Sequence, residues 1–340
     1  MSKIKISILF FFVSLYSLAQ DIHFSQYNDL PLALNPSLAG NMDGTMRTGT
    51  LYRNQWNSVS VPFESIALYT DFKSSPEFLR DQNIGLGIQI LNDQSGNGGL
   101  NENVFNFCGS YHYFLTQKEN QLFTAGLSLG GFQKSIDINK LNFENQFQFE
   151  TANFGSISSN EILENNFLIN FDLGLGASWT YYSENGHQAL AGFSISHLNR
   201  PNSSFYGNKA PTSRKYTFHS SGIYPINKKV DLDPSFLLSR QNKNTNTVIG
   251  ADLIYYLGRK TVEKIDLKIG LYARLGDALN FTIGMNHDNW SIDLGYDLNV
   301  SGLTSASQTR GAFEISISFV NRIFKGAKNM KYIIPGDRLL

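Results

Sequence analysis

The segment Gly126-Leu127-Ser128-Leu129-Gly130 could carry covalent chemistry, because it matches the G-x-S-x-G pattern of serine hydrolases. In those enzymes the serine lies on a sharp turn between a strand and a helix, which exposes its hydroxyl as a nucleophile. Here the residues after Ser128 continue an alternation of apolar and small positions, which predicts an extended strand through the motif. We therefore expect Ser128 to face the interior of a sheet structure, and a membrane-embedded hydrolase is the weakest functional alternative.

The histidines and the cysteine show no catalytic or metal-binding pattern. The six histidines are scattered without H-E-x-x-H or another zinc spacing. Cys108 is the single cysteine, so no disulfide can form within the chain. We predict no enzymatic activity, no cofactor and no metal site.

Charged residues are the remaining candidates, and many of them occur singly between apolar neighbours. The set predicted to face inward comprises Asp71, Asp172, Asp231, Asp233, Asp252, Asp266, Lys268, Arg274, Asp293, Asp297 and Glu314. These side chains could bind a partner domain or line a solute path, but ion pairs that fill the interior are the favoured interpretation. Acids outnumber bases in this set, so a basic segment of this chain or of a partner would complement it.

The N-terminus predicts export from the cytoplasm. Lys3 and Lys5 precede an apolar run from Ile6 to Leu18, and small residues then suit cleavage near Ala19/Gln20, so residues 1–19 read as a signal peptide. The net charge is zero, with 28 basic and 28 acidic residues, which argues against nucleic-acid binding. Charged residues make up only 16% of the chain, against ~25% in soluble domains, while aromatic residues reach 13%. This balance suits a protein that contacts membrane lipid.

The elements that position these residues are predicted to be strands. No apolar stretch after residue 19 approaches the ~20 residues of a membrane-spanning helix. Instead, apolar residues recur at every second position, most clearly in 167–182, where Phe167, Ile169, Phe171 and Leu173 alternate with polar or small residues. Such segments are predicted at 45–54, 63–72, 84–91, 104–115, 122–132, 167–182, 188–198, 214–225, 230–240, 247–257, 264–275, 279–286, 290–298 and 311–320.

About 14 strands of this length predict an all-β fold, a transmembrane antiparallel β-barrel with an N-terminal plug-like segment. If the N-terminus starts in the periplasm, most periplasmic connections are short and most extracellular ones are long, as in bacterial barrels. The exceptions are the periplasmic 73–83 and the tight turn at Gly276-Asp277. A soluble sandwich or up-and-down barrel is the alternative, since its strands alternate as well.

Three regions lie outside the strand pattern. Residues 20–44 carry Pro31 and Pro36, which favour a defined extended path, and this segment could be a plug, a clasp on the periplasmic mouth or a flexible leader. The barrel is expected over 45–324, and the tail 325–340 could contact periplasmic secretion components.

The loop 133–166 is far longer than a turn requires, which is typical of functional loops. Its aromatic residues are Phe143, Phe147, Phe149 and Phe154. They are candidates for contact with a partner protein or glycan, or for a lid over the lumen.

Several motifs resemble one family closely. His23, Phe24 and Gln26 within 21–27, and Asn35, Pro36 and Gly40 within 31–40, resemble the mature start of the PorP/SprF outer-membrane proteins. Tyr52, Arg53, Gln55 and Trp56 resemble that family's first-strand motif, and the resemblance extends over nearly the whole mature chain.

The resemblance implies a Gram-negative outer-membrane barrel of the type IX secretion and gliding system. Its partner would be a secreted client protein, adhesin-like, whose C-terminal sorting domain needs the barrel for export or surface anchoring. Family members often end in Pro-Cys-Pro-Arg, whereas Ile334-Pro335-Gly336-Asp337-Arg338 lacks the cysteine, so no role of that thiol is carried over. The alternative function is a channel or transporter for a hydrophobic or small solute, because fourteen-stranded fatty-acid transporters also carry an N-terminal plug.

Overall fold

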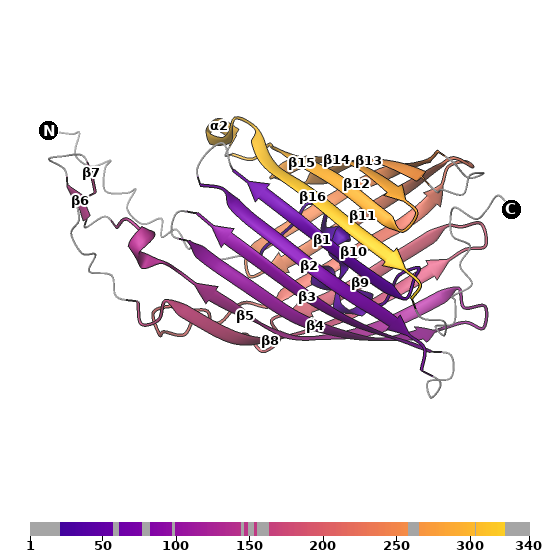
Figure 1. Ribbon diagram of the computed structural model, residues 1–340, viewed down its shortest axis with the longest axis horizontal. Helices are drawn as coiled ribbons and strands as arrows, with labels where there is room; N and C mark the ends of the chain where they lie inside the picture. The colour runs from indigo at the N-terminus through magenta and orange to yellow at the C-terminus, as the bar shows by residue number, and fades with distance from the viewer. Residues whose placement is uncertain are drawn as a thin grey trace, which may run out of the picture.

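The alternating segments form fourteen long strands and one short hairpin (Figure 1). The computed structural model describes residues 21–56, 61–76, 82–96, 99–143, 146–148, 153–154, 163–257, 265–302 and 304–323. The strands are β1 (Met46–Gln55), β2 (Phe63–Ser74), β3 (Asn83–Ser95), β4 (Leu100–Phe114), β5 (Gln121–Ser135), β6 (Phe147–Gln148), β7 (Asn153–Phe154), β8 (Phe167–Tyr182), β9 (Gln188–Ser196), β10 (Lys215–Pro225), β11 (Val230–Gln241), β12 (Asn244–Tyr256), β13 (Ile265–Arg274), β14 (Ala278–His287), β15 (Trp290–Asn299) and β16 (Arg310–Asn321). Helical turns are few: η4 (Ile138–Lys140) and α2 (Thr304–Ser307) lie in connections, and three more precede β1.

The fourteen long strands close into an antiparallel barrel, which confirms the predicted fold class and strand count. Sequential strands pair with each other, except that β5 pairs directly with β8 across the loop that holds β6 and β7. Closure is made by β1 and β16, which pair from Met46↔Asn321 to Gln55↔Ala312. The predicted strand bounds differ from the observed ones by only a few residues, because period-two alternation is a local signal.

The two faces of the barrel differ in the way that a membrane requires. Large apolar side chains point outward, for example Ile169 and Phe107, which are 73% and 61% exposed. Polar side chains such as Asp71, His112 and Glu314 point inward and are fully buried. A soluble β-fold would place its large apolar face against its own core, so this arrangement excludes the soluble alternative. Among the described residues, no helix has the length and apolar character to cross a membrane.

The connections divide the barrel into two ends. The loop end carries the long connections 136–166, 197–214 and 300–309, together with two tight turns at 242–243 and 275–277. The turn end carries short connections such as 115–120 and 183–187, with 75–82 as a longer exception. The loop end is the one that we expect to face the cell exterior.

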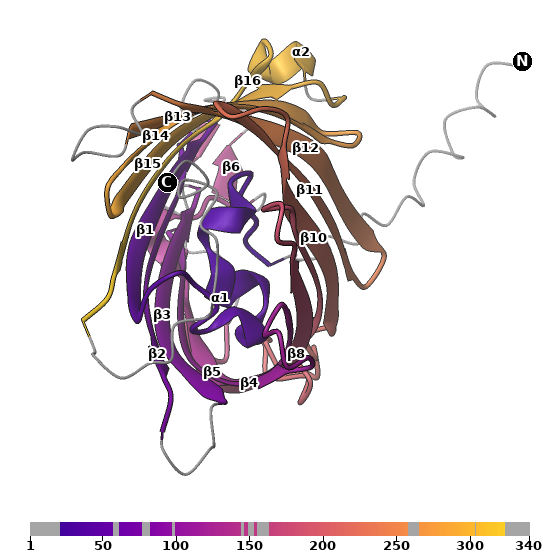
Figure 2. The same cartoon turned by 90° about the vertical axis from the view of Figure 1, so that its right-hand side faces the viewer.

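The N-terminal segment, residues 21–45, lies inside the barrel (Figure 2). It contains three short turns, η1 (Tyr27–Asp29), α1 (Pro31–Leu34) and η2 (Pro36–Leu38), and the two latter begin with a proline. At the loop end the Asp21 amide donates to Gln241 Oε1, and at the turn end the Thr45 amide donates to the Asn321 carbonyl. The segment therefore crosses the interior from the loop end to the turn end.

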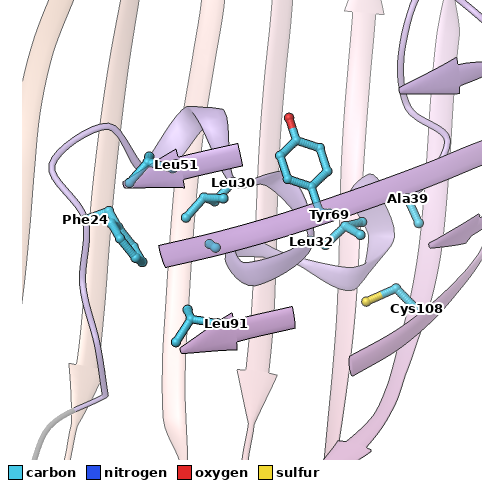
Figure 3. Packing of buried hydrophobic residues seen from close by; sticks show 9 residues of the cluster. Phe24, Leu30, Leu32, Ala39, Leu51, Tyr69, Leu91 and Cys108 are labelled. Atoms are coloured by element: carbon cyan, nitrogen blue, oxygen red, sulfur yellow. The ribbon is translucent and has the colours of Figure 1, made fainter. Parts of the chain in front are cut away.

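Apolar side chains of the N-terminal segment pack against opposite walls. One cluster joins Phe24, Leu30, Leu32 and Ala39 to Leu51, Ala67, Tyr69, Leu91 and Cys108 of β1 to β4 (Figure 3). The other joins Tyr27, Leu34 and Leu38 to Leu237, Val248 and Tyr272 of β11 to β13. A large apolar side chain that becomes fully buried contributes about 1.5–3 kcal/mol, so these clusters alone bind the segment firmly.

Candidate functional site

The interior of the barrel, which holds the N-terminal segment, is the candidate site. Nearer the loop end it contains a buried ionic cluster around Arg53. Arg53 of β1 is only 2% exposed and pairs with Glu314 of β16 and Asp297 of β15. Arg274 of β13 pairs with the same Asp297 at 2.8 Å. The strand register brings these residues to one level of the wall, since β1 and β15 are both neighbours of β16.

The N-terminal segment completes this cluster. Its amides at Ser25 and Gln26 each donate to one oxygen of Glu314, both at 2.8 Å. The Ser25 hydroxyl donates to Asp297 at 2.8 Å. Glu314 thus binds Arg53 and the backbone of the segment, while Asp297 binds both arginines and the Ser25 hydroxyl. The loss of Arg53 would leave the buried charge of Glu314 without its partner.

A second set of polar contacts holds the segment at the loop end. Asp21 accepts from His197 Nε2 at 2.9 Å and from Gln241 Nε2 at 2.8 Å, and Lys215 lies 3.5 Å away. Burial alone would raise the pKa of Asp21, but Lys215 and the His197 contact hold that pKa well below its usual value. Burial disfavours the charge of His197, yet its bonds to Asp172 and Asp21 raise the pKa of His197 to about 10. At neutral pH the imidazolium therefore joins the segment to β8.

The lower part of the segment rests on glycines of the wall. Side chains added at Gly85, Gly126 and Gly176 would collide with the backbone or side chains of residues 35–39. Gly40 itself has φ +69° and sits with its Cα region against Gly85, a conformation and closeness that favour glycine. These contacts set the segment directly into the surface of β3, β5 and β8.

Hydrogen bonds, most of them between neutral groups, surround this backbone contact. The carbonyl of Ala39 accepts from Ser110 Oγ at 2.6 Å and from His112 Nε2 at 2.9 Å. The Ser37 hydroxyl donates to Ser178 Oγ at 2.9 Å. The amide of Gly40 donates to Asp71, whose carboxylate also binds Arg47. Polar groups of a turn-rich segment are in this way satisfied within the barrel.

A small chamber of about 70 Å³ remains between the segment and β10 to β12. Its wall is mostly apolar and includes Phe24, Leu30, Leu34, Leu91 and Leu237. His23, Lys215 and Asn246 provide its polar groups. Burial, reinforced by the charges of Arg274 and Arg53, lowers the pKa of His23 to about 3, so this imidazole is neutral.

The inward charges predicted from the sequence are largely paired with each other or with barrel hydroxyls. Lys268 pairs with Asp293 at 2.6 Å, Arg274 with Asp297, and Asp172 with His197. Four more of the set bind wall groups: Asp71 binds Arg47, Asp231 and Asp252 accept from tyrosines, and Glu314 binds Arg53. Asp233 and Asp266 are half-buried on the same face. Ion pairs that fill the interior are thus the interpretation that agrees with the geometry.

Other predicted residues fall elsewhere. Ser128 lies in the middle of β5, which continues to Ser135, so the turn required for a nucleophile elbow is absent at this motif. Among the described residues, no group of three or more His, Cys, Asp or Glu could hold a metal ion.

Three of the four aromatic loop residues are described, and they lie in or next to the small hairpin beyond the loop end. Phe147 of β6 is the register partner of Phe154 of β7, and this hairpin stands away from the barrel (Figure 1). Phe143 is half-buried just before it, and Phe149 lies outside the described residues. The signal peptide 1–19 and the tail 325–340 also lie outside them.

Sequence reasoning missed the base that complements the inward acids. The N-terminal segment carries no Lys or Arg, so it is not the basic element expected. Arg47 and Arg53 of β1 supply the charge instead. The alternation within 45–54 could have revealed that both arginines face the interior. They occupy odd positions of this strand, whereas Thr48 and Tyr52 occupy even positions, on the outward face.

A closed fourteen-stranded barrel with an apolar exterior defines the class of outer-membrane β-barrel proteins. Among solved structures, it is similar to the toluene transporter TbuX of Ralstonia pickettii, with a TM-score of 0.53, 11% identity, and coverage of 86% of this chain and 94% of that chain. A mutant of the monoaromatic hydrocarbon channel TodX gives a TM-score of 0.50, 8% identity, and coverage of 85% and 93%. Identities this low show a shared fold only. No curated protein matches the sequence.

The family is nevertheless clear. Residues 17–319 match the family described as type IX secretion system membrane protein PorP/SprF. The chain belongs to this family, as its N-terminal motif predicted.

Proposed function

We propose that this barrel is a non-enzymatic component of the type IX secretion system that is needed to export or anchor a cognate secreted protein at the cell surface. The client, an adhesin-like protein, would bind through its C-terminal sorting domain. Periplasmic components of the secretion system are further proposed partners, with the tail 325–340 as their contact.

One observation carries this proposal: the N-terminal segment fills the barrel from the loop end to the turn end and bonds to both walls. A segment that is bound in the lumen by ion pairs, two apolar clusters and glycine contacts disfavours an open pore. Together with the family, this favours a protein that works through its rims and not through its lumen.

At the loop end, the hairpin of β6 and β7 offers a docking element that the barrel itself does not need. Of the candidate residues, Phe143, Phe147 and Phe154 belong to this region, and Phe149 lies between them in the sequence. Aromatic side chains are common anchors of protein interfaces. We therefore place client contact at this hairpin.

The proposal is tested by deleting the gene and comparing the proteins on the cell surface by mass spectrometry. We expect one large secreted protein to be lost from the surface and to return when the wild-type gene is restored. The double variant Phe147→Ser and Phe154→Ser should restore barrel assembly but not client retention. Tyr206→Ser, which alters an exposed aromatic in the loop 197–214, is the matched control and should restore both. An unchanged surface proteome in the deletion strain would refute the proposal.

A second candidate function is transport of an apolar solute, and the apolar chamber beside the segment is the observation that favours it. The similar solved structures include those of a toluene transporter and a monoaromatic hydrocarbon channel. In this case the deletion strain would keep its surface proteins and lose growth on a particular apolar nutrient.

A further inference from the structure

Three arginines surround a hollow of about 480 Å³ at the rim of the barrel, on the loop end. The hollow is lined by Arg200, Ser213, Arg214, Tyr216, Arg240 and Asn242. Arg200 and Arg214 come from the loop 197–214, while Arg240 lies near the end of β11. All three arginines are exposed.

This hollow opens on the outer side of the barrel and not into the lumen. Arg240 and Tyr216 are register partners on β11 and β10, and Tyr216 is 43% exposed. Leu238 and Phe218, the next register partners on the outward face, are exposed apolar residues below them. Along the outer surface, apolar residues are followed by a tyrosine and then by arginines. This is the order of layers expected from the acyl region of a membrane to its headgroups.

The three arginines of the hollow differ from the arginines that form ion pairs. Arg47, Arg53, Arg274 and Arg322 each form an ion pair with an aspartate or glutamate. Within the described part of the chain, no carboxylate forms an ion pair with Arg200, Arg214 or Arg240. Arg214 is held in place by two bonds of 3.2 Å from its guanidinium to the Leu198 carbonyl. Among the described residues, the hollow thus presents concentrated positive charge without a carboxylate paired to it.

We propose that this arginine site binds the phosphate groups of a phosphorylated lipid headgroup in the outer leaflet. Guanidinium groups bind phosphate oxygens in a two-pronged geometry, and several of them converge here. The apolar surface of Phe218 and Leu238 continues directly below the site, so acyl chains of the same lipid can follow it down the barrel. A soluble anion would bind the arginines but would make no contact with this apolar surface. The site goes beyond the proposed secretion function, because it concerns the lipid around the barrel and not the client.

The test compares lipid retained by the full-length protein after extraction in detergent, measured by native mass spectrometry. The probe is diphosphorylated lipid A added to phosphatidylcholine vesicles that contain the reconstituted barrel. The variant with Arg200→Ala, Arg214→Ala and Arg240→Ala should retain at least about tenfold less lipid A, since it loses the charge-assisted hydrogen bonds to the phosphates. The control variant, Lys118→Ala, Lys228→Ala and Lys229→Ala, removes three exposed cations at the turn end and should retain the wild-type amount.

Both variants are first shown to fold by their heat-dependent migration in gels, so a loss of lipid is not a loss of the barrel. Equal retention by wild type and arginine variant would overturn the proposal, as would equal loss in both variants. Dephosphorylated lipid A that binds as well as the phosphorylated form would also overturn it. If inorganic phosphate alone occupied the site and displaced the lipid fully, the site would be one for small anions and not for lipid.

Discussion

The two halves of the N-terminal segment are held by different forces. The first half, Asp21 to Gln26, is bound through charges: His197 and Lys215 at Asp21, and Glu314 and Asp297 at Ser25 and Gln26. The second half, Asn35 to Gly40, is bound mainly through backbone contact with glycines and through neutral hydrogen bonds. The first type of attachment depends on pH and on single charges, while the second depends on shape.

This difference indicates which half of the segment could be released from the barrel wall. A segment set against glycine backbones has no room for bulkier side chains, so we expect the second half to stay in place against the wall. The first half would be released if its charges were removed. Substitutions that act on one half should therefore leave the other in place.

The largest effect is expected from Arg53→Ala. This change leaves Glu314 buried without its arginine, while Asp297 keeps Arg274 and loses only its second arginine. Breaking a buried ion pair in this way costs about 3–5 kcal/mol. We expect a lower urea midpoint for barrel unfolding and faster hydrogen exchange at the amides of Ser25 and Gln26. Arg322→Ala is the control, because its pair with Asp43 is exposed and contributes only about 0–1 kcal/mol. Similar losses in both variants would contradict the role of the buried cluster.

A smaller effect, confined to the second half, is expected from Gly126→Ala. The added methyl group meets the backbone of Pro36 and Ser37, and such overpacking costs about 1–3 kcal/mol. Hydrogen exchange should accelerate at residues 37–40 while the amides of Ser25 and Gln26 keep their protection.

The matched control for this change is Gly109→Ala on the outer face of β4, where a methyl group meets nothing closer than 4.0 Å. It should leave exchange in the whole segment unaltered. Equal acceleration by both substitutions would show that the wall glycines do not seat the segment.

The smallest effect is a release of the first half at high pH. The folded pKa of His197, about 10, lies above its ordinary value of 6.5, so its contribution is complete below pH 6.5 and is lost as the pH rises through 10. The pKa of Asp21 is lowered, so its contribution persists above its ordinary value and is lost only in acid. A spin label at Ile22→Cys, in a Cys108→Ala background, should become mobile near pH 10, whereas a label at Ala33→Cys should not.

The same label gives the control for this prediction. In the His197→Gln variant, the label at Ile22 should be more mobile at neutral pH and should show no further transition near pH 10. A transition that persists in this variant would mean that another group, and not His197, holds the start of the segment.

The barrel could be predicted from sequence much better than its interior. Alternation within each strand is a local signal, so the residues Phe167 to Tyr182 predicted β8 without information about the strands beside it. The ion pair of Arg53 with Glu314 joins residues far apart in the chain, and it depends on closure between the first and last strands. The sequence showed Arg53 only as part of a family motif.

The path of the N-terminal segment was equally beyond a local pattern. Its turns follow from Pro31 and Pro36, but its place against Gly85 and Gly126 follows from the register of β3 and β5. Small residues on the inward face were visible in the sequence, yet their reason, contact with another backbone, exists only in the folded barrel. The sequence therefore offered candidate inward charges but not the partners that they bind in the barrel.

The most direct test is to lock the segment in place and measure client retention at the cell surface. The variant carries Ser37→Cys and Ser178→Cys in a Cys108→Ser background, and the two replaced hydroxyls are 2.9 Å apart. An intramolecular disulfide can therefore join the segment to β8 in the oxidising periplasm. If the barrel works with its interior filled, the oxidised variant retains as much client on the surface as the Cys108→Ser parent and the Ser178→Cys single variant. Loss of the client that is reversed by reductant would show that the segment must leave the lumen, and would contradict a rim-docking barrel.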